Sequence, residues 1–299
     1  DPHVIKTAWN AAFERICLSK HFGFSQPLDP AQWKCTMVRA ARMGLPLSLG
    51  QCGEVLKLAD GKMTEGKTLI RFFSMPGRNG VRHLPSAAPD RWEMFKKYCM
   101  RDVEVEQALL AKVRRLEPAE FDEQLYIIDQ EINDRGVLID RVLVDAAARF
   151  DVEYKAELLK EAQNITGLNN PNSAAQLKSW LNENTGIGVI SSLNKKSIDE
   201  IEDALIYWPK ARRVIALRRE MAKTSNKKYE AMQTCVCDDG RIHGLLQFCG
   251  AARTGRWAGR LVQVQNLPQN HLNDLDYART LVKTGDLEEF EMNYADVTQ

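Results

Sequence analysis

Two short patterns carry side chains that suit metal-assisted hydrolysis. Asn10 and Glu14 stand four residues apart, as do Tyr98 and Asp102, so a helix places each pair on one face. A carboxylate beside an amide can hold a hydrated divalent metal ion, and a phenol beside a carboxylate can orient an attacking water. Each pair also has a structural explanation, an exposed helix start for the first and a tyrosine–aspartate hydrogen bond for the second.

A third pattern is an arginine- and glycine-rich string followed by amides. Arg253, Arg256 and Arg260 are separated by glycines, and Gln265 and Asn266 follow shortly after. Glycine lets a backbone come close to a ligand, arginine binds phosphate and groove acceptors, and amides bind sugar and base edges. A solvated polar loop is the alternative, but such an ordered string favours contact with nucleic acid.

The charge distribution supports this interpretation, although the net charge does not. The whole chain carries 41 Lys or Arg against 40 Asp or Glu, a formal net charge of +1. Residues 209–260 hold 12 basic and 4 acidic residues, and residues 269–299 hold 2 basic and 7 acidic. A basic segment of this kind is typical of a nucleic-acid contact. We expect its basic helix face to consist of Arg212, Arg219, Lys223 and Lys227.

Length and composition limit the class of protein. The 299 residues suggest about two domains, with 44% hydrophobic residues and no apolar run of the roughly 18 that a membrane span needs. No secretory signal pattern is visible at the start. The seven cysteines fit no zinc spacing, so we expect free thiols in a reducing compartment.

The elements that position these residues are mostly helices. Trp9, Phe13 and Cys17 are expected to face the core, and capping-box spacing predicts helix starts at Asp90, Ser173 and Ser197. Apolar stripes predict further helices. One stripe is Phe121, Leu125, Ile128 and Ile132, and a second runs from Leu143 to Leu158 in a helix that ends near Gly167. An amphipathic helix over 210–232 and a short helix over 274–283 are also predicted. Residues 137–139 read as a strand, and 234–237 with 241–248 as a β-hairpin.

Taken in order, these motifs resemble family A DNA polymerases, the DNA polymerase I group, and most closely the bacteriophage and prophage versions. Asn10-x-x-Phe13-Glu14 resembles the second motif of the proofreading 3′–5′ exonuclease, and Tyr98-x-x-x-Asp102 resembles its third motif. Further stretches resemble the polymerase region. They are Arg135–Asp140, Asn169–Leu177, Ala222–Ser225, Gly240–His243, and Thr254–Arg256 with Gln265–Pro268.

The resemblance implies a fold and a domain order. We expect an incomplete α/β RNase H-like exonuclease domain over 1–118 that lacks its first motif. A mainly α-helical thumb over 119–233 and the start of the palm, opened by a β-hairpin, over 234–299 would follow. It implies a DNA-directed DNA polymerase with 3′–5′ proofreading that acts in DNA replication, of which this chain is a central fragment.

The resemblance also implies roles for individual residues. In the intact enzyme two Mg²⁺ ions would be held partly by Glu14 and Asp102, and Tyr98 would orient the attacking water. Primer–template DNA would contact the basic helix face together with a second group of polar side chains. This group is Arg253, Arg256, Gln265 and Asn266. Deoxynucleotides are the implied substrates, and a monomer in the bacterial cytoplasm, with no membrane partner, is the implied state.

Departures from the family pattern leave alternatives open. The second exonuclease motif usually ends in Asp and here ends in Glu14, which puts proofreading in doubt. The D-x-E pair of the first motif and the polymerase carboxylates are absent. We therefore expect this chain alone neither to extend primers nor to degrade 3′ ends. A stand-alone exonuclease with a DNA-binding appendage and a non-catalytic DNA-binding module are the alternatives.

Overall fold

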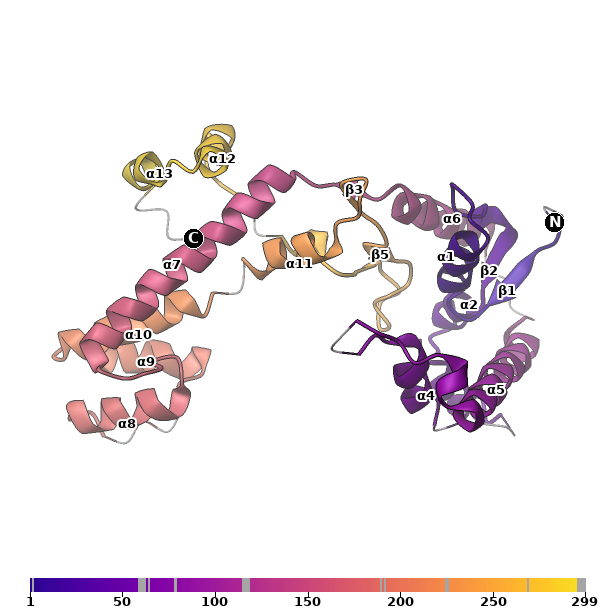
Figure 1. The fold of residues 1–299 in the computed structure, drawn as a ribbon, viewed down its shortest axis with the longest axis horizontal. Helices are drawn as coiled ribbons and strands as arrows, with labels where there is room; N and C mark the ends of the chain where they lie inside the picture. Colours follow the sequence, from indigo (N-terminus) through magenta and orange to yellow (C-terminus); the bar gives the residue numbers. More distant parts are fainter. Residues whose placement is uncertain are drawn as a thin grey trace. The chain divides into compact units, whose positions relative to one another are not determined.

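The computed structural model describes residues 1, 3–58, 63, 65–77, 80–114, 119–188, 190, 192–223, 226–267 and 269–294. The chain forms two compact units, each made of two separate stretches of sequence (Figure 1). Unit 1 contains residues 1–137 and 243–263, and unit 2 contains 138–242 and 264–299. In the part of the chain that is described, no helix is both long and apolar enough to cross a membrane.

Unit 1 begins with a small β-α-β arrangement. Strand β1 (Lys6–Ala8) pairs in parallel with β2 (Trp33–Cys35), and Lys6, Thr7 and Ala8 lie opposite Trp33, Lys34 and Cys35. Helix α1 (Ala11–His21) and the short 3-10 helix η1 (Pro30–Gln32) connect the two strands. Parallel strands need such a crossover, so this connection places α1 against the pair.

Further helices complete the N-terminal part of unit 1. They are α2 (Thr36–Arg42), α3 (Leu49–Val55), α4 (Gly66–Ser74), η2 (Pro85–Ala87), α5 (Pro89–Val113) and α6 (Glu120–Arg135). One core cluster joins α2, α3 and α5 through buried Ala40, Cys52 and Leu109. A second cluster, around Leu69, Phe73 and Tyr98, joins α4 to α5. The long helix α5 is therefore fixed at both ends by apolar packing.

The second segment of unit 1, residues 243–263, packs on the first. Strands β5 (Leu246–Gln247) and β6 (Ala258–Gly259) form an antiparallel pair, and buried Phe248 packs in the same cluster as Trp33 and Tyr126. Its non-glycine residues with left-handed backbone are Cys249, Leu261 and Gln263, each with φ of 53°. Such residues are strained, so the contacts of this segment must hold its path.

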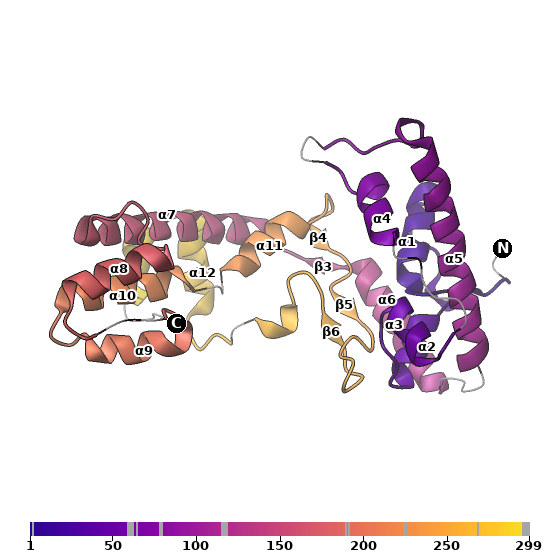
Figure 2. The same cartoon turned by 90° about the horizontal axis from the view of Figure 1, so that it is seen from below.

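Unit 2 is built mainly from helices, and Figure 2 shows α7 running beside α10. Strand β3 (Val137–Leu138), where the chain passes between the units, pairs with β4 (Arg241–Ile242). The helices are α7 (Arg141–Thr166), α8 (Ala174–Asn184), α9 (Lys195–Ala204), α10 (Pro209–Met221), α11 (Lys227–Cys235), η3 (Val264–Asn266), α12 (Leu275–Thr284) and α13 (Leu287–Tyr294).

Several sequence expectations for these elements are confirmed. Helix α7 ends at Gly167, which has φ of 72° and so adopts the left-handed conformation that glycine permits. Ser173 caps α8 by accepting a hydrogen bond from the Gln176 backbone N–H, as the capping-box spacing predicts. The strand at 137–138 and the helix α12 are also present. These features depend on local chemistry, which a single sequence contains.

Other expectations are wrong. The helix predicted over 210–232 is two helices, α10 and α11, and Thr224 and Ser225 between them lie outside the described residues. Residues 234–237 do not form a hairpin with 241–248, because α11 extends to Cys235 and β4 pairs with β3. The N-cap positions of α5 and α9 are Ala88 and Asn194. The predicted domain boundary at 118 falls within 115–118, which also lie outside the described residues.

Candidate functional site

Glu14 lies in the first turn of α1, and its carboxylate is half-buried. In the described part of the chain its buried Oε2 atom has no hydrogen-bond partner. Burial raises the pKa of Glu14, and the nearby carboxylate of Glu106 raises it further. The sequence prediction for its neighbours is partly wrong, because Phe13 and Cys17 are exposed and Asn10 precedes the helix in a left-handed conformation.

Tyr98 and Asp102 lie one turn apart on α5, as the spacing predicts. The Tyr98 ring is buried, stacks on Phe95 with centroids 6.1 Å apart, and packs against α4 at Gly66. Asp102 is half-buried. One turn further along α5, buried Glu106 accepts a hydrogen bond from Thr36 Oγ1. Glu106 was not predicted, although its four-residue spacing from Asp102 continues the same helix face.

The described residues supply only part of a metal site. No group of three or more His, Cys, Asp or Glu side chains that could hold a metal ion occurs among them. A divalent ion such as Mg²⁺ usually needs near-octahedral oxygen ligands, including several waters. The partnerless buried oxygen of Glu14 suits one such ligand, but the described residues alone do not complete a site.

The arginine-rich string forms an exposed loop in unit 1. The backbone N–H groups of Thr254 and Gly255 donate to the carbonyl of Ala251, and Ala251 N–H donates to the carbonyl of Arg256. The Arg253 and Arg256 side chains are exposed, and within the described ranges neither makes an ion pair or hydrogen bond. Two guanidinium groups are therefore available to an anionic ligand. We call residues 250–260 the arginine loop.

The predicted basic face in unit 2 is only partly assembled. Arg212 and Arg219 lie on α10, Lys223 follows the end of that helix, and Lys227 begins α11. All are exposed, but Arg219 forms an ion pair with Glu202 at 2.8 Å, whereas Arg212 makes none with the described residues. The helix break means that helical spacing does not place Lys227 on the face of Arg212.

The two amides that the sequence predicts as DNA contacts belong to unit 2, whereas the arginine loop belongs to unit 1. Gln265 and Asn266 form part of the 3-10 helix η3, and both side chains are exposed. Pro268, which ends the matching motif, lies outside the described residues.

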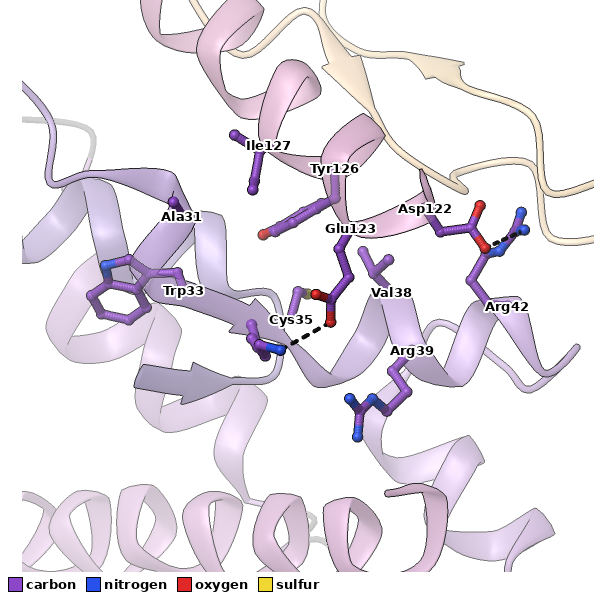
Figure 3. Close-up of a pocket in the computed structure, with 11 residues that line it drawn as sticks. Ala31, Trp33, Cys35, Val38, Arg39, Arg42, Asp122, Glu123, Tyr126 and Ile127 are labelled. Carbon is purple, nitrogen blue, oxygen red and sulfur yellow. Dashed lines mark hydrogen bonds and ion pairs between the residues drawn. The ribbon is translucent and has the colours of Figure 1, made fainter. Parts of the chain in front are cut away.

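A pocket in unit 1 lies between α2, β2 and α6 (Figure 3). Lys34 pairs with Glu123 at 3.0 Å and Arg42 pairs with Asp122 at 2.6 Å. The pocket contains none of the side chains that the sequence identified. Its lining residues are Ala31, Trp33, Lys34, Cys35, Val38, Arg39, Arg42, Asp122, Glu123, Tyr126 and Ile127. Because four of its charged side chains neutralise one another in these two ion pairs, the pocket adds little to the candidate site.

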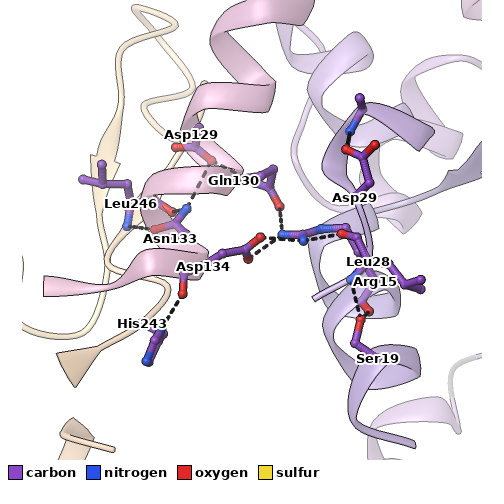
Figure 4. Close-up of polar contacts among 11 residues, drawn as sticks. Arg15, Ser19, Leu28, Asp29, Asp129, Gln130, Asn133, Asp134, His243 and Leu246 are labelled. Atoms are coloured by element: carbon purple, nitrogen blue, oxygen red, sulfur yellow. Dashed lines mark hydrogen bonds and ion pairs between the residues drawn. The ribbon is translucent and has the colours of Figure 1, made fainter. Parts of the chain in front are cut away.

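Sequence reasoning missed a buried polar network on α6, drawn in Figure 4. Arg15, only 1% exposed, donates to both carboxylate oxygens of Asp134 at 2.7 Å and to Gln130 at 3.2 Å. Gln130 in turn donates to Asp129 at 2.9 Å. The predicted apolar stripe of α6 is not its main buried face, since Phe121 and Ile128 are exposed.

Comparison with known proteins shows which class of protein the chain is similar to. Over its length the chain is similar to a phage DNA polymerase, which confirms the resemblance to phage-type DNA polymerases. The relative is a protein named DNA polymerase from Bacillus phage SP02, and the identity is 53% over 304 aligned residues. The alignment covers 98% of this chain but only 46% of that relative, so the chain spans about half its length. No family model matches the chain.

Proposed function

We propose that this chain is part of a DNA-directed DNA polymerase of the phage type that acts in DNA replication. The observation that carries the proposal is the 53% identity to a phage DNA polymerase across 98% of the chain. The exposed arginines of the arginine loop support it, because a polymerase must bind the phosphates of duplex DNA whatever the base sequence. Primer–template DNA and deoxynucleotides are the proposed ligands of the complete enzyme.

We propose the finer assignments on the motif resemblance. Residues 1–118 would form an RNase H-like exonuclease domain, 119–233 a thumb and 234–299 the start of a palm, in a monomer in the bacterial cytoplasm. Glu14 and Asp102 would supply some ligands for Mg²⁺, with Tyr98 beside them. DNA polymerases as a class use divalent metal ions for phosphoryl transfer.

Primer extension tests the main proposal. The open reading frame that encodes this chain is expressed complete and incubated with a labelled primer–template, deoxynucleotides and Mg²⁺. Template-directed extension is expected. Digestion of the primer without extension would favour the stand-alone exonuclease. DNA binding with neither reaction would favour the non-catalytic module.

An exonuclease variant tests the finer assignment in the same protein. Asp102→Ala should abolish 3′–5′ digestion and leave extension nearly intact, because the two reactions would occur at separate sites. Tyr98→Phe should slow digestion less, since it removes a hydroxyl and no carboxylate ligand. Digestion at the parent rate by Asp102→Ala would contradict the exonuclease assignment while leaving the polymerase proposal standing.

A further inference from the structure

Trp257 connects the arginine loop to α6 by a hydrogen bond. Its indole Nε1–H donates a 2.7 Å hydrogen bond to Oδ1 of Asp129, and its ring meets Phe248 edge-on with centroids 5.1 Å apart. The Asp129 side chain is buried, with 1% of the residue exposed, whereas 40% of Trp257 is exposed. Trp257 follows Arg256 directly, so the anchor adjoins one of the available arginines.

The carboxylate that accepts this bond is itself held in place. Its other oxygen accepts hydrogen bonds from Gln130 at 2.9 Å and from Asn133 at 3.2 Å. The Asn133 amide also exchanges two 2.9 Å hydrogen bonds with the backbone of Leu246, in strand β5. Asp129 therefore cannot rotate away from Trp257 without breaking other buried bonds, which are costly to lose.

The loop needs such an anchor. Cys249, just before the loop, and Leu261, just after it, have left-handed backbone, a conformation that persists only where the surroundings enforce it. The Arg253 and Arg256 side chains make no bond to the described residues that would fix their positions. The region that their guanidinium groups can reach is therefore set by the loop backbone, and the Trp257 hydrogen bond connects that backbone to buried Asp129 on α6.

We propose that Asp129 is a positioning residue for DNA binding, which acts through Trp257 to hold the arginine loop in its contact conformation. This inference rests on the proposed function, because it takes the loop arginines to contact primer–template DNA. Asp129 itself is buried and touches no DNA. The expected consequence of losing the anchor is weaker binding of DNA by a protein that remains folded.

The same helix face connects the anchor to α1. Asp129, Gln130 and Asp134 lie on α6, and Arg15 joins the last two to the helix that carries Glu14. The arginine loop and Glu14 accordingly belong to one compact unit, although more than 230 residues separate them in sequence. A displacement of the loop is thereby resisted by buried bonds of unit 1.

The test replaces Trp257 by phenylalanine, which keeps a ring against Phe248 and removes only the N–H donor. Trp33→Phe is the matched control, because the buried Trp33 Nε1 has no hydrogen-bond partner in the described part of the same unit. Binding of a fluorescent primer–template is measured by anisotropy at one salt concentration. A hydrogen bond to a charged acceptor contributes roughly tenfold, so Trp257→Phe should bind about tenfold more weakly and Trp33→Phe like the parent.

A double-mutant cycle separates positioning from a general loss of structure. If the anchor acts through Arg256, Trp257→Phe should add little to the loss caused by Arg256→Ala, whereas independent effects add. Asp129→Asn keeps an acceptor for the indole and should bind better than Asp129→Ala. Parent-like binding by Trp257→Phe, or full additivity, would overturn the inference. Failure of the parent chain itself to bind DNA would instead contradict the proposed function.

Discussion

Arg15 and Asp134, 119 residues apart in sequence, form a two-pronged ion pair in which both N–O distances are 2.7 Å. Arg15 is buried and also donates to the carbonyl of Leu28. Removing one partner of such a pair leaves an uncompensated charge in the protein interior. The pair therefore makes the junction of α1 with α6 sensitive to a single substitution.

Asp134→Ala should destabilise unit 1 by about 3–5 kcal/mol, the usual cost of breaking a buried ion pair on one side. Glu161→Ala is the matched control. It breaks the two-pronged pair of Glu161 with Arg213, which is exposed, and should change stability by no more than about 1 kcal/mol. Urea denaturation followed by tryptophan fluorescence measures both. Equal effects would show that burial of the Arg15 pair is unimportant.

Gly66→Ala should destabilise the packing of α4 on α5. A Cβ atom at Gly66 would lie 2.1 Å from the Tyr98 ring, so the ring or the helix must shift, at a cost of about 1–3 kcal/mol. Gly53→Ala is the control, since the nearest atom to its Cβ would be 3.5 Å away. Thermal melting compares the variants. A Gly66→Ala protein as stable as Gly53→Ala would contradict the tight contact with Tyr98.

The salt dependence of DNA binding should distinguish two neighbouring arginines of α10. Arg212 makes no ion pair with the described residues, whereas Arg213 is held by Glu161 at 2.7 Å. If Arg212 neutralises one phosphate, Arg212→Ala should reduce the slope of log K against log salt by about one. Arg213→Ala should change it less. Anisotropy at several salt concentrations gives the slopes, and identical slopes for both variants would remove Arg212 from the interface.

Asp129 should make stability depend on pH. Burial raises its pKa, although hydrogen bonds from Trp257 and Gln130 partly oppose this. Because the folded-state pKa is above the unfolded one, the contribution of Asp129 to stability declines as the pH rises from about 4 through the raised pKa. Asp129→Asn cannot ionise and lacks this decline. Its unfolding free energy relative to the parent should thus improve with rising pH, and a constant difference would contradict the raised pKa.

Local features of this protein were predictable from its sequence, and long-range ones were not. Gly167 ends α7 and Ser173 caps α8 because backbone freedom and a nearby hydroxyl suffice to specify those ends. The buried face of α6 could not be predicted. The sequence of α6 alone predicts that its apolar stripe is buried. Asp129 is buried instead, and its hydrogen-bond donor Trp257 lies 128 residues away in sequence.

The candidate site shows the same division. The spacing of Tyr98 and Asp102 on one helix is confirmed, since four residues make about one turn. The proximity of Glu14 to Glu106 depends on how α1 and α5 pack, and no short pattern contains that information. The predicted partner of β4 is wrong for a similar reason. The strand pairs with residues 137–138 rather than with the nearer segment 234–237.

Because unit 1 is made of two separate stretches of sequence, the ribosome synthesises its two parts at different times. When residue 137 has left the ribosome, α6 is present but the stretch that covers its polar face is not. Translation must add residues 138–263 first, which takes on the order of ten seconds at bacterial rates. During that interval Asp129 and Asn133 lack their partners Trp257 and Leu246, and residues 138–242 of unit 2 can begin to fold before unit 1 is complete. Unit 1 can therefore be completed only after residues 138–242 of unit 2 have been made, although its own larger stretch precedes them.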